Sequence, residues 1–109
     1  MVIQSFTFNP FQENTYLLFD ETKECIIFDP GCYFPNEKKE LTDFIEKNNL
    51  KPTKLINTHC HLDHVCGNKF VAEKYNLKLE MHKDDLPILQ AIPRVGKEYG
   101  MPIETSPEP

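Results

Sequence analysis

The chain has 109 residues, the size of one small domain, and its 12 Lys and Arg against 17 Asp and Glu give a formal net charge of −5. An acidic chain without a basic stripe is not expected to bind nucleic acid. No apolar run approaches the roughly eighteen residues of a membrane span, and no export signal opens the sequence. We therefore expect a cytoplasmic domain with neither a membrane nor a nucleic-acid partner.

The first third of the chain shows the composition of strands. Val2–Phe8 is rich in β-branched and aromatic residues, with Ile3, Phe6 and Phe8 as expected core contacts. The apolar runs Thr15–Phe19 and Cys25–Phe28 follow, and the short polar segment between them predicts an antiparallel hairpin.

The turn Asp29-Pro30-Gly31 closes the third strand, because proline lacks a backbone donor and glycine allows a positive φ. This turn places the Asp29 carboxylate at the end of the strand. It could accept backbone hydrogen bonds within the turn or take part in a site.

The remainder alternates helical and strand patterns. A helix is predicted over 36–49 with Asn36 as its cap, a second helix ends at Tyr75, and a third is opened by Asp84 and Asp85 and ended or kinked by Pro93. Short strands over 54–57 and 77–82 separate them, and strand–helix–strand connections predict parallel pairing. The expected fold is therefore α/β with a mixed sheet, helices on one face and the other face uncovered.

Thr58–His64 contains three of the four histidines together with one aspartate. Residues two apart in an extended chain face the same way, so His59 and His61 can bind one ion. If a helix begins at Leu62, Asp63 and His64 point elsewhere and could hold a second ion. The spacing therefore predicts a metal centre.

The four cysteines, at 25, 32, 60 and 66, are expected to be reduced thiols because no export signal is present. Cys25 begins an apolar strand and is predicted to be buried. Cys60 and Cys66 flank the histidines, so a structural zinc site of mixed Cys and His is an alternative. The absence of a CxxC pair and of finger-like spacing argues against it.

The order Asp29-Pro30-Gly31 and then Thr58-His59-Cys60-His61-Leu62-Asp63-His64 resembles the metallo-β-lactamase superfamily. Gln12-Glu13-Asn14-Thr15-Tyr16 is similar to the start of its glyoxalase II-like branch, the hydroxyacylglutathione hydrolases. The match extends from the first strand to about Asp85. The resemblance implies that residues 1–109 are the N-terminal half of an αββα sandwich. The proline-rich segment 101–109 would then be a tail or linker to a missing C-terminal half, and that half or a second copy of the chain would cover the open face of the sheet.

Residue by residue, the resemblance implies that His59 and His61 ligate a first metal and that Asp63 and His64 ligate a second. Asp29 would lie behind them and hydrogen-bond the histidine segment, and the Cys60 side chain would point away from the metals. One or two Zn²⁺ ions are implied, with Fe or Mn as alternatives. His82 matches no motif, and we expect it at the surface or behind the ligands.

The implied reaction is hydrolysis of a thioester or similar acyl substrate by a metal-bound hydroxide, which Asp63 would help to orient as the catalytic residue. The remaining family ligands come from the missing half, so the 109 residues alone are expected to be inactive. Two alternatives stay open. One is a mononuclear iron sulfur dioxygenase or a lactonase of the same fold, and the other is a non-catalytic half-domain that self-associates through its exposed sheet.

Overall fold

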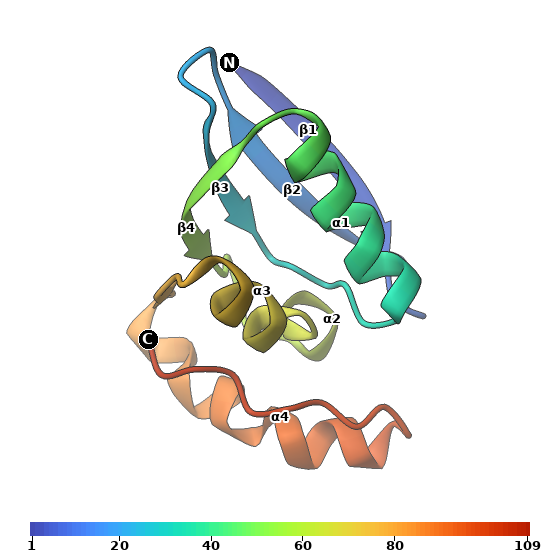
Figure 1. Ribbon diagram of the computed structural model, residues 1–109. Helices are drawn as coiled ribbons and strands as arrows, with labels where there is room; N and C mark the ends of the chain where they lie inside the picture. Colours follow the sequence, from blue (N-terminus) through green and yellow to red (C-terminus); the bar gives the residue numbers. More distant parts are fainter.

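The computed structural model describes residues 1–109 and contains one five-stranded sheet in the order β1-β2-β3-β4-β5 (Figure 1). β1, β2 and β3 pair antiparallel, and β4 and β5 continue the sheet in parallel to β3. This arrangement confirms the predicted α/β fold with a mixed sheet. The strands are β1 Val2–Phe8, β2 Glu13–Phe19, β3 Glu24–Phe28, β4 Lys51–Ile56 and β5 Leu79–Glu80, and the helices are α1 Pro35–Lys47, α2 Leu62–Val65, α3 Asn68–Tyr75, the short 3₁₀ helix η1 Lys83–Asp85 and α4 Leu86–Glu98.

The core lies on one face of the sheet. Leu17, Ile27, Leu55 and Leu79 are paired neighbours in one row across four strands, and each is at most 2% exposed. Helix α1 lies over this face beside β1 and β2 (Figure 1), where the ring of Phe44 meets the edge of the Phe6 ring at 5.5 Å. Burial of this row holds the strand ends that carry the candidate site in place.

The opposite face of the sheet is uncovered. Ile3, Leu18 and Ile26 are cross-strand neighbours on it, and Ile3 is 67% exposed. The prediction that Ile3 contacts the core is therefore wrong. Side chains alternate along a strand, and Phe6 and Phe8 take the covered face, so Ile3 must point to the other side.

Helix α1 begins one residue before the predicted cap. Its first residue is Pro35, which suits the first helical position, and Asn36 makes no capping hydrogen bond. Instead the Glu37 carboxylate accepts from the backbone N–H groups of Tyr33 at 2.9 Å and Phe34 at 3.1 Å. The prediction of an Asn36 cap is wrong because Pro35 already begins the helix, so that Asn36 is its second residue and Phe34 holds the capping position.

Three further boundaries differ from the sequence prediction. β4 begins at Lys51 and includes Pro52, which lies where the register of β3 shifts and where a missing N–H disturbs the pairing least. β5 is only two residues long. Helix α4 continues past Pro93 to Glu98, because residues buried on both sides of the proline, Ile92 and Gly96, anchor it. None of the helices has the length and apolar character needed to cross a membrane.

The segment 101–109 contains no helix or strand, yet its first part is packed onto the domain. Met101 and Ile103 are 7% and 8% exposed. Tyr33 donates its hydroxyl to the carbonyl of Pro102 at 3.1 Å, and the Asn68 amide donates to the Ser106 hydroxyl at 3.1 Å. The segment therefore lies against the body of the domain, and its role as a linker to a further half stays a prediction.

Candidate metal centre

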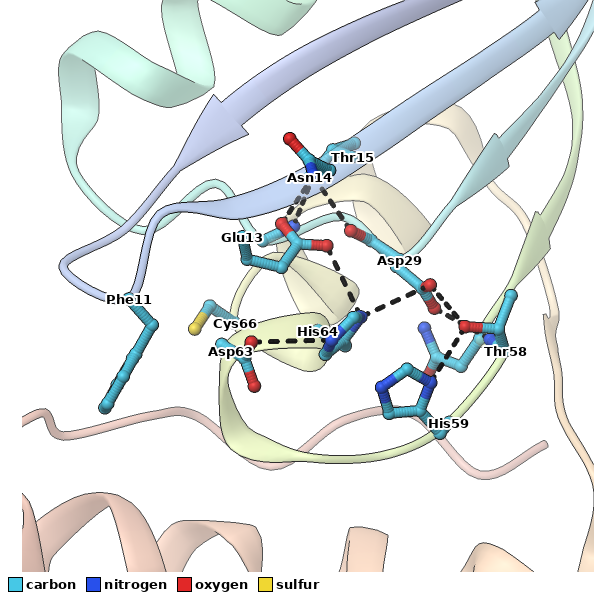
Figure 2. A network of polar contacts seen from close by, with 12 residues as sticks. Phe11, Glu13, Asn14, Thr15, Asp29, Thr58, His59, Asp63, His64 and Cys66 are labelled. Atoms are coloured by element: carbon cyan, nitrogen blue, oxygen red, sulfur yellow. Dashed lines mark hydrogen bonds and ion pairs between the residues drawn. The ribbon is translucent and has the colours of Figure 1, made fainter.

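The candidate site lies at the edge where β3 and β4 end. Asp29 follows β3, and His59 follows β4 through a short extended segment. Because β2 runs antiparallel to β3, its first residue, Glu13, lies at the same edge. Side chains far apart in sequence therefore meet at the carboxyl ends of parallel strands, which is where open α/β sheets place their ligands (Figure 2).

The histidines of the motif form one cluster. The rings of His59 and His64 have centroids 3.8 Å apart, and those of His59 and His61 are 4.9 Å apart. Nε2 of His64 lies 3.4 Å from an Asp63 carboxylate oxygen. Ligand atoms of Asp29, His59 and His64 all lie within 4.8 Å of one another. The structure thus brings ligand atoms of Asp29, His59 and His64 together, whereas His61 and Asp63 lie beside this group. The division of the ligands between two metals stays a prediction.

Asp29 links the two strand ends. Its backbone is left-handed, with φ 51°, a region that Asp tolerates better than most residues. Its carboxylate accepts from the Thr58 backbone N–H at 2.7 Å and from the Thr58 hydroxyl. That hydroxyl also lies 3.1 Å from Nδ1 of His59. Since its proton is used on Asp29, it can only accept from His59, which leaves Nε2 of His59 free for a cation.

His64 is held over a buried acidic pair. Its Nδ1 lies 3.3 Å from an Asp29 carboxylate oxygen and 3.5 Å from Oε1 of Glu13 (Figure 2). Neither Nδ1 of His64 nor Oε1 of Glu13 makes a hydrogen bond in the structure. A proton between them satisfies both atoms and leaves Nε2 of His64 facing outward, as carboxylates behind metal-bound histidines do.

Glu13 is the functional residue that the sequence analysis missed. It is 3% exposed, and burial, reinforced by the nearby Asp29 and Asp63 charges, raises its pKa to about 8. The sequence did carry a signal, because Glu13 alternates with Thr15 and Leu17 on the covered face of β2. An acid at a buried position of a strand needs partners, and here the Thr15 hydroxyl donates to Oε2 at 3.0 Å while Oε1 lies 3.5 Å from Nδ1 of His64.

The turn that carries Asp29 is packed tightly against the site. A Cβ on Gly31 would lie 2.2 Å from Oε2 of Glu13 and 2.7 Å from the carbonyl oxygen of Asp63. The Asn9 amide donates to the carbonyls of Gly31 at 3.0 Å and Asp63 at 2.9 Å, so it joins the turn to the start of α2. The glycine is therefore required by close approach rather than by its own φ.

Gly31→Ala is expected to lower the free energy of unfolding by about 3 kcal/mol, because the added methyl must displace a buried carboxyl and a backbone carbonyl. Gly100→Ala is the control. Its Cβ would meet no atom within 4 Å, and only its φ of 71° opposes the change, so a loss of about 1 kcal/mol is expected. Urea unfolding measures both variants, and equal losses would show that close packing at Gly31 is unimportant.

The cysteines do not join the histidine cluster. All four are free thiols, as predicted, and Cys25 is fully buried. Burial raises the pKa of Cys60 to about 11 and that of Cys66 to about 12, which disfavours the thiolate that a zinc ion requires. The Cys60 thiol contacts Asn57 and Met81 instead. The geometry therefore does not support a mixed Cys and His zinc site.

The residues present fit a divalent cation. Two ligands at 2.0–2.1 Å from zinc lie at most about 4.2 Å apart, so small side-chain rotations bring the nitrogens of His59 and His64 and an Asp29 oxygen within reach of one ion. Asp63 and His61 adjoin them. His82 remains outside the cluster, 67% exposed and 3.6 Å from Asp84.

Comparison with known proteins decides the family. The family model described as the metallo-beta-lactamase superfamily matches residues 8–103. The chain belongs to this superfamily. The resemblance carried by the Asp-Pro-Gly turn and the histidine motif is thereby confirmed.

Among curated proteins of the superfamily, the chain is 32% identical over 76 residues to the probable metallo-hydrolase YqgX of Bacillus subtilis, covering 70% of this chain and 34% of that protein. It is 28% identical over 103 residues to the hydroxyacylglutathione hydrolase GloC of Haemophilus influenzae, covering 94% of this chain and 47% of that protein. It is 39% identical over 65 residues to the hydroxyacylglutathione hydrolase of Buchnera aphidicola, subspecies Baizongia pistaciae, covering 60% of this chain and 24% of that protein.

Two solved structures of the superfamily share the fold closely. TTHA1623 in a di-iron-bound form superposes with a TM-score of 0.84 at 27% identity over 97% of this chain and 51% of its own. The BLEG-1 B3 metallo-beta-lactamase gives a TM-score of 0.82 at 26% identity, and the superposition covers 99% of this chain and 50% of that one. The chain therefore spans about half the length of these structures and less than half of the curated relatives it matches.

Proposed function

We propose that the chain is the N-terminal half of a metal-dependent hydrolase that cleaves a thioester or a similar acyl compound. The observation that carries the proposal is the convergence of Asp29, His59 and His64 at the edge of the sheet. Support also comes from the relatives, several of which are named hydroxyacylglutathione hydrolases.

Each residue of the centre has a distinct role in this proposal. His59, His61, Asp63 and His64 hold one or two divalent ions, while Asp29 fixes the histidine segment through Thr58. A bound cation supplies a water whose pKa is lowered toward about 7 and polarises the acyl carbonyl. The Asp63 carboxylate, 3.4 Å from Nε2 of His64, would orient a water held by such an ion.

We propose zinc as the metal, with iron or manganese as the alternatives. Two histidine nitrogens and carboxylate oxygens suit either ion. The similarity to TTHA1623, whose structure is a di-iron-bound form, favours iron as the second candidate. Elemental analysis of the purified protein distinguishes a zinc pair from iron.

A complete centre needs ligands from outside these residues, because a catalytic zinc site usually has three protein ligands and an open position for each metal. The open face of the sheet, with Ile3 67% and Tyr16 39% exposed, is the surface on which a second half fits. We propose that a C-terminal half of the protein covers this open face. If a second copy takes that place instead, sedimentation of the 109-residue chain will give the mass of a dimer.

The test is hydrolysis by the whole protein in which this chain occurs. With Zn²⁺ or Fe²⁺ supplied, we expect cleavage of a hydroxyacyl thioester, and Asp63→Asn should lower kcat by at least about 100-fold because it removes an anionic ligand and the group that orients water. Asp84→Asn, at an exposed carboxylate outside the centre, is the control and should keep kcat. A protein that hydrolyses no thioester, or full activity of Asp63→Asn, would refute the proposal.

A further inference from the structure

A largely apolar cavity adjoins the candidate metal centre. It is a groove of about 520 Å³ between α4 and the loop that joins β1 to β2. Ile88, Ala91 and Val95 line its α4 side. Phe11, from the loop, meets the ring of Tyr99 edge-on at 5.9 Å, so the two rings join its walls. In Figure 2 the Phe11 ring points away from the buried carboxyls.

Residues of the metal centre also line this groove. His61 and Asp63 of the metal centre line it, and the groove is therefore continuous with the place where chemistry would occur. No Lys or Arg lines it, and the chain carries a net charge of −5. A carboxylate on the acyl chain would meet no cationic side chain along the α4 wall, so this wall disfavours anionic groups.

The apolar wall is exposed where a ligand would rest. Ile88 is 41%, Phe11 47% and Tyr99 64% exposed. Large apolar side chains gathered around a concavity mark a binding surface, and the volume falls within the usual range of small-molecule sites, about 300–1,000 Å³. An apolar chain that begins beside His61 and Asp63 would cover these side chains.

We propose that this groove binds the acyl group of the substrate and selects an uncharged, apolar acyl chain of medium length. The inference rests on the proposed hydrolase function and adds the substrate class. In this proposal the acyl carbonyl lies beside His61 and Asp63, and the hydrocarbon tail lies against the apolar side chains of α4. Selectivity arises from burial of the apolar chain and from the absence of a cationic side chain along the α4 wall.

The first test measures binding to the 109-residue chain without metal, using hexanamide and butanamide as acyl probes that cannot be hydrolysed. NMR titration should shift the backbone amides of α4 and Phe11. Each buried methylene strengthens binding by roughly fourfold, so hexanamide, which has two more methylenes, should bind about fifteenfold more tightly than butanamide. Equal affinities, or shifts confined to the open face around Ile3 and Tyr16, would overturn the proposal.

A matched pair of variants tests the location. Ala91→Glu places a carboxylate in the groove wall and should weaken hexanamide binding at least about fivefold. Gln90→Glu adds the same charge one residue away, at an exposed position outside the lining, and should leave binding unchanged. Circular dichroism confirms that both variants fold. Unchanged binding by Ala91→Glu would overturn the proposal.

Hydrolysis by the whole protein separates this inference from the function on which it rests. If hexanoyl thioesters are cleaved with a kcat/KM about tenfold above that of butanoyl thioesters, both stand. If both are cleaved equally, the groove proposal fails and the hydrolase stands. If hexanamide binds in the groove but no thioester is cleaved, the proposed reaction fails and the apolar ligand site stands.

Discussion

Replacing His59 by alanine is expected to weaken binding of Zn²⁺ to the chain by at least about 100-fold. Substitutions behind a metal ligand already cost about 10–100-fold in affinity, and loss of a ligand itself costs more. His59 offers one of the three ligand atoms that converge within 4.8 Å. Competition between the chain and a chromogenic chelator measures the change.

His82→Ala is the matched control, because it removes the one histidine that lies outside the cluster. Its affinity for Zn²⁺ should equal that of the unchanged chain. Cys60→Ala distinguishes the mixed Cys and His alternative and should also keep the metal. Retention of tight binding by His59→Ala, together with its loss in Cys60→Ala, would reverse the assignment of the centre.

The stability of the metal-free chain is expected to fall as pH rises from about 5 to 8. Unfolded Glu13 releases its proton near the ordinary glutamate pKa of 4.5, whereas burial in the folded chain raises the pKa to about 8. Between these values the folded state binds more protons than the unfolded state, so the free energy of unfolding decreases with pH. The full shift corresponds to about 5 kcal/mol, and we expect about 3 because the surroundings of a buried charge relax.

Glu13→Gln should remove most of this pH dependence, since its amide occupies the same space and carries no charge at any pH. Urea unfolding at several pH values measures the slope. Glu24→Gln, at an exposed glutamate at the start of β3, is the control and should keep the slope of the unchanged chain. A slope that survives in Glu13→Gln would mean that another buried group is responsible.

The local pattern of apolar and polar residues was sufficient to predict the order of the strands and helices. Alternating and continuous apolar runs located the five strands, and the Asp-Pro-Gly turn marked the end of β3. The boundaries were less accurate, because Pro52 and Pro93 are accommodated by pairing and packing that no local rule contains. Ile3 was assigned to the core because the composition of β1 does not reveal which face of the strand is covered.

For the site, the sequence by itself determined the residue types and their spacing: His59, His61, Asp63 and His64 follow one strand, and Asp29 follows another. Only the tertiary structure decided that Asp29 reaches Thr58, that Glu13 lies behind His64, and that a groove without cations adjoins Asp63. The physical reason is the sheet register, which sets distant residues side by side at one edge. A short motif predicts which candidate ligands follow a strand. Contacts between strands depend on how the whole sheet pairs and packs, so no short motif predicts them.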